Sequence, residues 1–266
     1  MRRIVSTDKK GKKKLVNVPS WDNIYVNNQM GQPAYDVSIS SNGNGTPAPV
    51  VLLNATSYTG SGTTWPDTSG NGYNATLYNS PTYNSTYFSF GNTSTKYANV
   101  SNIGDLNRWT IEAWFRVTGN LSSKEATAVI TTVFDIPGVL NTGVINYVIG
   151  TPSSYSNSLM VGFFNGSWHQ CTPFTPTVNA WYQVMGTYDG SVLRQYVNGV
   201  LNSSLNYVGV SSANGGDIRI ARRWDATVDT LHYFPGDVGI VRIYNTAFDS
   251  SQVSTNFNEF RTVYGI

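Results

Sequence analysis

The chain has almost no cysteine, the residue that forms disulfides and many structural metal sites. Its 266 residues include a single cysteine, Cys171. One cysteine excludes an internal disulfide framework and a zinc site made of cysteine ligands. We expect Cys171 to be a half-buried strand residue.

Charge and long apolar runs are also scarce. Charged residues make up 12% of the chain, about half the usual share. No apolar stretch approaches the roughly 18 residues that a membrane span needs, so no membrane partner is expected. The basic N-terminus is not followed by an apolar segment, so we expect no signal peptide. The surface is instead rich in Asn, Ser, Thr and Tyr, as is common in extracellular and virion proteins.

Basic charge is concentrated at the N-terminus. Residues 1–14 hold one acid and seven basic residues, which are Arg2, Arg3, Lys9, Lys10, Lys12, Lys13 and Lys14. The net charge of this stretch is +6, whereas the ten basic and fourteen acidic residues that follow give −4. The pattern therefore predicts a basic arm attached to a mildly acidic body.

We assign residues 1–46 to an extended arm and linker, and 47–266 to one domain. Residues 1–46 show no periodic pattern that would form a core element, and 38–49 are rich in Ser, Asn, Gly and Pro. Trp21 and other apolar residues are unusual in a disordered tail, so we expect the arm to dock onto the body or another chain. Three partners are open for its charge: nucleic acid, an acidic protein surface, or solvent alone. An acidic protein surface is favoured, because the arm contains no nucleic-acid-binding motif.

The sequence of the body predicts a long series of β-strands. Residues 109–117 alternate, with Ile111, Ala113, Phe115 and Val117 on one face and Thr110, Glu112, Trp114 and Arg116 on the other. Further strands are predicted at 50–53, 75–78, 87–90, 97–100, 128–134, 145–150, 158–164, 168–174, 181–188, 192–197, 217–222 and 237–244. Such a series predicts an all-β antiparallel sandwich of the jelly-roll kind.

Two short sequence patterns predict a hairpin turn and a helix. Asn198-Gly199 lies between strand-like segments and predicts a two-residue hairpin turn, because both positions take positive φ. Residues 250–260 predict the one convincing helix, with Asp249 as its N-cap and Gln252 completing a capping box.

Eight motifs in order resemble the laminin-G-like, concanavalin A-like lectin and glucanase family over residues 50–266. They lie at 52–55, 65–72 (Trp-Pro-Asp-Thr-Ser-Gly-Asn-Gly), 87–91, 109–115, 181–189, 195–200, 218–221 and 234–245. The resemblance implies a concanavalin A-like sandwich with one C-terminal helix. This resemblance indicates the fold alone, so the function must be argued from the residues of a particular site.

Enzyme activity is not expected. Related glucanases use carboxylates at alternating positions on one strand, so that acid and nucleophile share a face. The chain has only three glutamates, and Glu112 alternates with Thr110 and Trp114, which leaves it without a partner. The two histidines, His169 and His232, lie near no evident Ser and Asp pair.

Calcium is the candidate cofactor, since many domains of the resembling family hold it at the sandwich rim. Asp67 and Asn71 in the 65–72 turn, with Asp237 at the start of the last strand, are the candidate ligands. The alternative is an Asx turn at Asp67 and a surface carboxylate at Asp237.

Sugar binding needs rim aromatics that stack on pyranose rings. The candidates are Trp168, Trp224, Tyr155 and Tyr233, which lie in or beside predicted loops. Packing beneath those loops, or a protein interface, is the alternative reading. The sequence does not name a glycan.

These observations favour a structural protein of a virion, such as a tailed phage, located at the capsid surface or another exposed part. The arm would attach it to other virion proteins, and the sandwich would bind host-surface polysaccharide or stabilise the shell. A free-standing carbohydrate-binding lectin is the alternative, and a glycan-degrading enzyme a third. Nucleic acid is not an expected partner, and a homo-oligomer is compatible with the sequence.

Overall fold

The computed structural model divides the chain into two compact units, Met1–Ser38 and Ile39–Ile266. It describes the backbone of residues 2–7 and 13–18, and backbone and side chains of 45–92, 94–132, 145–211, 216–223 and 229–266. We treat each unit by itself.

The N-terminal unit contains a β-hairpin that the sequence analysis missed. Strands β1 (Arg2–Thr7) and β2 (Lys13–Val18) pair antiparallel, with Arg2 opposite Val18 and Thr7 opposite Lys13. The sequence analysis expected no core element within 1–46 and did not predict these two strands. Arg2, Arg3, Lys13 and Lys14 belong to these strands, whereas Lys9, Lys10, Lys12 and Trp21 lie outside the described residues.

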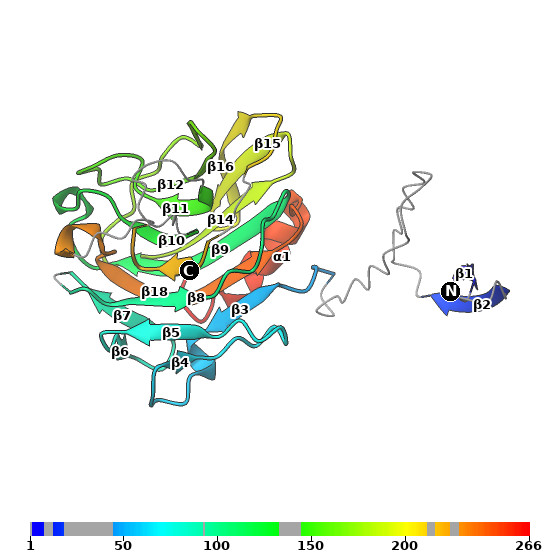
Figure 1. Cartoon of the computed structure of the whole chain (residues 1–266), viewed down its shortest axis with the longest axis horizontal. Helices are drawn as coiled ribbons and strands as arrows, with labels where there is room; N and C mark the ends of the chain where they lie inside the picture. The colour runs from blue at the N-terminus through cyan, green and yellow to red at the C-terminus, as the bar shows by residue number, and fades with distance from the viewer. Residues whose placement is uncertain are drawn as a thin grey trace. The chain divides into compact units, whose positions relative to one another are not determined.

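The larger unit is a sandwich of two eight-stranded antiparallel sheets (Figure 1). The first sheet has the order β13-β12-β11-β10-β17-β8-β5-β4. Its strands are β4 (Thr64–Trp65), β5 (Ala75–Tyr78), β8 (Tyr97–Val100), β10 (Ala128–Thr132), β11 (Ile145–Gly150), β12 (Met160–Phe164), β13 (Trp168–Gln170) and β17 (Ile218–Ile220).

The second sheet has the order β16-β15-β14-β9-β18-β7-β6, with one further strand, β3, paired to β18. Its strands are β3 (Val51–Asn54), β6 (Thr82–Tyr83), β7 (Phe88–Gly91), β9 (Trp109–Val117), β14 (Trp181–Tyr188), β15 (Val192–Val197), β16 (Val200–Asn206) and β18 (Gly236–Tyr244). Strands β3 and β18 come from opposite ends of the domain sequence, so their pairing closes the sandwich.

The core lies between the two sheets. Residues at alternate positions of each strand point inward, and the largest of them are aromatic. Trp65, Trp109, Tyr147, Phe115 and Phe163 are each at most 1% exposed. The sequence-based fold class, an antiparallel sandwich with one C-terminal helix, is confirmed, although several predicted strands are shorter than expected.

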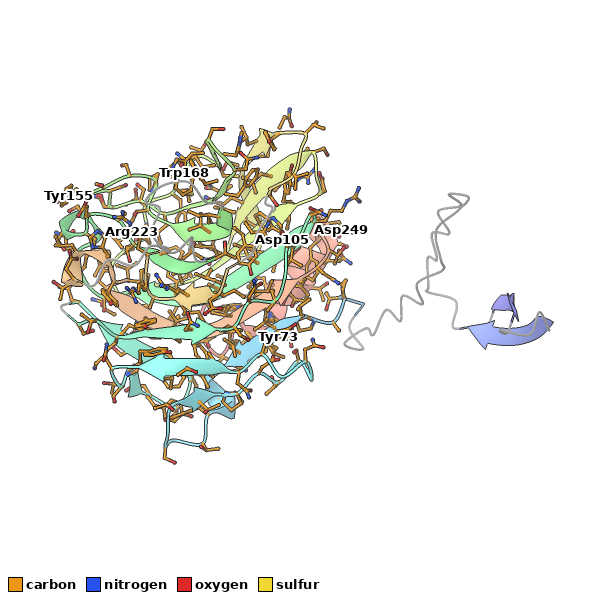
Figure 2. All side chains as sticks on the ribbon, in the orientation of Figure 1. Tyr73, Asp105, Tyr155, Trp168, Arg223 and Asp249 are labelled. Atoms are coloured by element: carbon orange, nitrogen blue, oxygen red, sulfur yellow. The ribbon has the colours of Figure 1, made fainter. Side chains whose placement is uncertain are left out.

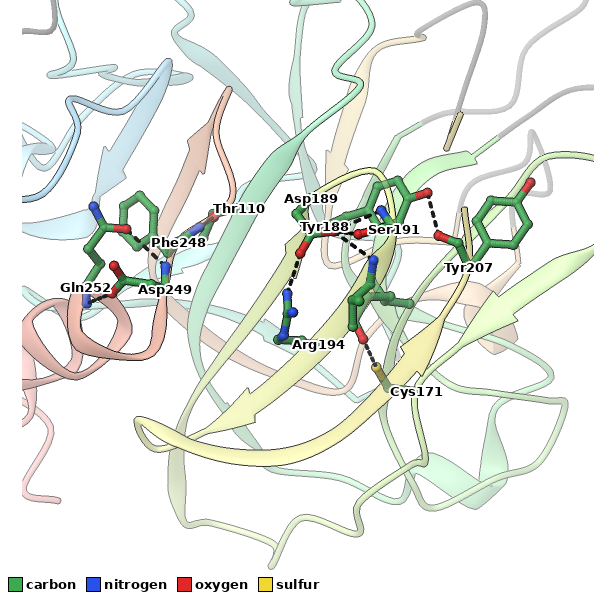
Figure 3. Close-up of polar contacts among 12 residues, drawn as sticks. Thr110, Cys171, Tyr188, Asp189, Ser191, Arg194, Tyr207, Phe248, Asp249 and Gln252 are labelled. Atoms are coloured by element: carbon green, nitrogen blue, oxygen red, sulfur yellow. Dashed lines mark hydrogen bonds and ion pairs between the residues drawn. The ribbon is translucent and has the colours of Figure 1, made fainter. Parts of the chain in front are cut away.

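Both local predictions of turn and helix are confirmed. Asn198 and Gly199 have φ of 50° and 76° between β15 and β16. Helix α1 (Ser250–Phe260) begins at Asp249, whose carboxylate accepts from the backbone N–H groups of Ser251 and Gln252, and the Gln252 side chain completes the capping box (Figure 3).

The C-terminal helix and the residues after it cover the outer face of the second sheet. The Trp114 ring on β9 stacks on Phe257 at 5.7 Å and on Tyr264 at 5.0 Å. Both faces of β9 are therefore buried, the inner one in the core and the outer one under α1. In the first sheet, by contrast, the outward positions Thr76 and Tyr78 of β5 are exposed.

Cys171 lies just after β13 and is fully buried, so it is neither half-buried nor in a strand as expected. Its thiol lies 3.8 Å from the carbonyl oxygen of Leu193 (Figure 3). Burial raises the pKa of Cys171 to about 11, which makes it an inert core residue. In the described part of the chain, no helix has the length and apolar character of a membrane crossing.

Candidate functional site

Five polar or aromatic residues form a continuous patch on the outer face of the first sheet. In β5 and β8 the residues Ala75, Leu77, Ala98 and Val100 point into the core, and in β17 so do Ile218 and Ile220. The alternate positions of these strands therefore point outward. They are Thr76, Tyr78, Tyr97, Asn99 and Arg219, which we call the tyrosine–arginine face.

Strand register fixes how these side chains are arranged. Thr76 lies opposite Asn99, and Asn99 lies opposite Arg219, so these three form one line across three strands. At the usual strand spacing the line is roughly 10 Å long. Tyr78 lies opposite Tyr97, two residues along from that line. In Figure 1 the strands β8 and β5 run side by side down this part of the sandwich.

The two tyrosines form an aromatic platform. Their ring centroids are 4.5 Å apart and their planes differ by 4°, so the rings are stacked. Tyr78 is 41% exposed, which leaves one side of the pair open to solvent. An exposed, rigid aromatic face is the surface on which a sugar ring packs through its C–H groups.

The guanidinium of a buried arginine, Arg222, lies close to this aromatic platform. The Arg222 guanidinium is 4.8 Å from the Tyr97 ring centroid and 5.2 Å from that of Tyr233. Arg222 follows Ala221, a non-glycine residue with φ of 63°, which is an uncommon and costly conformation. Arg222 itself is 4% exposed, so it acts through its charge and packing and does not form open surface.

Hydrogen-bonding groups flank the aromatic platform. The Asn99 side-chain amide donates to the Asp217 carboxylate at 2.9 Å, and Arg219 Nη1 donates to the Arg223 carbonyl oxygen at 3.4 Å. Burial raises the pKa of Tyr233, while the charges of Arg222 and Arg219 act in the opposite direction. The charges of Tyr97 and Asp229 raise this pKa as well, so the two arginines share this region with an acidic group.

Of the aromatic residues singled out in the sequence, the three that the structure describes lie in different parts of the sandwich. Trp168 is 40% exposed and packs 5.5 Å from Phe164 at the β13 edge, and Tyr155 is 58% exposed in the loop between β11 and β12. Tyr233 is 2% exposed, with its ring 6.0 Å from that of Tyr97. Trp224 lies outside the described residues.

Strand order separates these candidates. Strand β13, which carries Trp168, is five strands away from β8, which carries Tyr97. At the usual strand spacing this is roughly 24 Å. Figure 2 shows Trp168, Tyr155 and Arg223 at one end of the sandwich and Tyr73 away from them. Among the candidates that the structure describes, Tyr233 belongs to the surroundings of the tyrosine–arginine face.

The turn at residues 65–72 is held together by Asp67. Its Oδ1 accepts from the N–H groups of Leu52 and Ser69, and its Oδ2 accepts from the Ser69 hydroxyl and the Tyr73 N–H. These four bonds use the acceptor sites that a carboxylate offers. The geometry is that of the Asx turn considered as the alternative.

The other two candidate calcium ligands are also engaged. The Asn71 amide nitrogen donates to the Val50 carbonyl oxygen at 2.9 Å. Asp237 is 2% exposed and pairs with Arg116 at 2.6 Å, so the expectation of a surface carboxylate is wrong. Burial alone would lower the pKa of Arg116, but the hydrogen bond and charge of Asp237 raise it.

Calcium at Asp67, Asn71 and Asp237 stays a prediction. The described residues include no group of three or more His, Cys, Asp or Glu side chains suited to a metal ion.

Glu112 forms a buried ion pair with an arginine that the sequence analysis did not identify. Its fully buried carboxylate accepts from Arg242 Nε at 2.6 Å and Nη2 at 3.0 Å, and from Trp114 Nε1 at 2.7 Å. Arg242 also pairs with Glu259 at 2.7 Å. Burial tends to lower the pKa of Arg242, but the charge and hydrogen bond of Glu112, together with the charges of Tyr244 and Glu259, raise it overall. This cluster lies under α1 and serves the fold.

His232 also has acidic neighbours that the sequence did not indicate. Its Nδ1 lies 2.6 Å from Asp229 Oδ1, and its Nε2 lies 3.2 Å from Glu125 Oε2. The imidazole is 3% exposed, and each of its nitrogens faces a different carboxylate. His169 Nε2 lies 3.2 Å from Ser167 Oγ and 3.0 Å from Asn165 Oδ1.

The chain spans about half or less of the solved structures that it resembles. The binding domain of botulinum neurotoxin serotype G matches with a TM-score of 0.60 and 14% identity, over 79% of this chain and 51% of that one. The serotype D/C binding domain matches with a TM-score of 0.57 and 18% identity, over 80% and 52%. A Trypanosoma rangeli sialidase, in complex with 2,3-difluorosialic acid, matches with a TM-score of 0.59 and 15% identity, over 79% and 32%.

At these identities the structural matches show the fold alone. No curated protein matches the chain significantly in sequence. The model of the concanavalin A-like lectin/glucanases superfamily matches residues 90–254, which is more than half of the chain. The protein therefore belongs to the concanavalin A-like lectin/glucanases superfamily.

Proposed function

We propose that the protein is a non-enzymatic binding protein whose sandwich attaches to carbohydrate through the tyrosine–arginine face. The observation that carries the proposal is the open Tyr78–Tyr97 stack beside Asn99 and Arg219. Aromatic rings would take the apolar face of a sugar, and the amide and guanidinium would bind its polar groups. The lectin-like fold of the chain is in keeping with this role.

The arrangement of acids favours binding over hydrolysis. A glycosidase needs two carboxylates that flank an accessible bond. Glu112 is buried against Arg242, and Asp237 is buried against Arg116. Glu125 and Asp229 are separated by the imidazole of His232, which both of them contact. The two buried acids are therefore neutralised by arginines, and the two half-exposed ones share one imidazole.

We further propose that the N-terminal unit attaches the sandwich to a larger assembly, and that this assembly is a virion. The basic hairpin forms a compact unit separate from the sandwich, as an attachment element would. Its partner would be an acidic surface on another virion protein. The sandwich would then present its sugar-binding face to polysaccharide on the host.

The experiment compares the full chain with a variant lacking residues 1–46. We expect both to bind the same members of a glycan array, and only the full chain to be incorporated into particles. Equal incorporation of both forms would refute attachment through the N-terminal unit and leave a free-standing lectin. Absence of any glycan binding by either form would refute the carbohydrate-binding role. Release of sugar fragments during the incubation would identify an enzyme.

A further inference from the structure

We propose that the tyrosine–arginine face recognises neutral saccharides through two adjacent ring hydroxyl groups, which donate hydrogen bonds to the carboxylate of Asp217. This rests on the proposed carbohydrate-binding function and names its ligand class. One sugar ring would pack on Tyr78, and the hydroxyl groups of that ring or of the next one would reach Asp217.

Asp217 is an exposed carboxylate held in a fixed orientation beside this face. It directly precedes β17, and the alternation of that strand places it on the same outer side as Arg219. Its Oδ2 accepts from Asn99 Nδ2 at 2.9 Å, and its Oδ1 accepts from the backbone N–H of Asn102 at 3.0 Å. A carboxylate offers about four acceptor positions, so each oxygen of Asp217 keeps about one for a ligand.

The Asn99 amide adds a further acceptor. An ionised carboxylate can only accept, so the amide nitrogen of Asn99 must face Asp217 and the amide oxygen faces away from it. Thr76 lies directly opposite Asn99 and is exposed, and its hydroxyl can donate or accept. The polar part of the site is therefore rich in acceptors, and its natural complement is a group that donates. Sugar hydroxyl groups donate, whereas an ionised carboxylate or sulfate group has no proton to offer.

The acceptors lie beside the aromatic platform, so one saccharide can use both. Asn99 is two residues from Tyr97 on the same face of β8, a step of roughly 7 Å along the strand. The two oxygens of one carboxylate are close together, so hydroxyl groups on neighbouring ring carbons can each donate to one of them. Hydrogen bonds to an ionised acceptor are about twice as strong as those between neutral groups. We therefore assign the largest polar contribution to Asp217.

The test titrates the full chain with neutral hexose oligosaccharides and with deoxy forms that each lack one of two adjacent ring hydroxyl groups, by isothermal titration calorimetry. Loss of a hydroxyl that donates to a charged acceptor should weaken binding at least about tenfold. Asp217→Asn should bring the ratio between parent and deoxy form close to one, with an unchanged midpoint of urea unfolding, because Asp217 is exposed. Glu259→Gln is the matched control, since it removes a carboxylate that is 39% exposed on α1, and it should preserve the ratio.

Two further probes define the ligand class. Sorbitol carries adjacent hydroxyl groups without a ring to pack on the tyrosines, and hexuronic-acid oligosaccharides carry carboxylates. We expect both to bind more weakly than the neutral oligosaccharides. Equal affinity for every parent and deoxy pair, an unchanged ratio in Asp217→Asn, tight binding of sorbitol, or a preference for the hexuronic acids would each overturn the inference. In these cases the inference fails alone wherever a saccharide still binds. If no saccharide binds, the proposed function fails with it.

Discussion

We expect Glu112→Gln to lower the free energy of unfolding by about 3–5 kcal/mol, the range found when one partner of a buried ion pair is removed. Arg242 is 2% exposed, and Glu112 is the fully buried partner that neutralises it through two hydrogen bonds. Glutamine keeps the shape and can still accept from Trp114, so the loss measures the missing charge. Urea unfolding followed by tryptophan fluorescence provides the measurement.

The control is Glu259→Gln, which removes the second carboxylate from the same arginine. The Glu259 side chain is 39% exposed, so its pair with Arg242 is screened and should contribute no more than about 1 kcal/mol. Equal losses in the two variants, or a loss below about 1 kcal/mol in Glu112→Gln, would contradict the assignment of Glu112 as the buried partner that stabilises Arg242.

The second large effect concerns ligand affinity. We expect Tyr78→Ala to weaken saccharide binding about 30-fold, since truncating an aromatic residue at the centre of a binding surface costs 2 kcal/mol or more. Tyr78→Phe retains the stacked ring and should bind within a few-fold of the unmodified protein. Because Tyr78 is 41% exposed, its replacement should have little effect on stability. Calorimetric titration with a saccharide that the full chain binds measures the affinity.

Tyr155→Ala separates this face from the loop aromatics. Tyr155 is 58% exposed but lies outside the tyrosine–arginine face, so its truncation should leave the affinity unchanged. If Tyr155→Ala loses binding and Tyr78→Ala does not, the ligand binds near the loop aromatics that the sequence analysis named as candidates.

Local patterns were enough to predict most of the fold. Alternation in residues 109–117 predicted β9, and Asp249 with Gln252 predicted the start of α1, because both signals depend on nearby residues alone. The hairpin β1–β2 was missed because the sequence of its strands is rich in basic residues and shows no clear apolar periodicity.

The contacts that need long-range register could not be predicted. Arg242, the ion-pair partner of Glu112, lies on β18, 130 residues away in sequence. The tyrosine–arginine face combines three short strands, β5, β8 and β17, whose neighbourhood only the sheet order reveals. The signal available in the sequence was that each strand alternates between inward and outward residues. The outward residues are Thr and Tyr in β5, Tyr and Asn in β8, and Arg in β17. The low exposure of Tyr233 also rules it out as a residue on which a sugar ring stacks. The sequence placed it beside a loop, but its ring packs against Tyr97.

The most direct test of the central claim is a map of backbone amide chemical shifts while a bound saccharide is titrated into the isotope-labelled protein. The account predicts that the largest changes fall in Ala75–Tyr78, Tyr97–Val100 and Ile218–Ile220. Changes confined to the turn at residues 65–72, or to the loops that carry Tyr155 and Trp168, would contradict it.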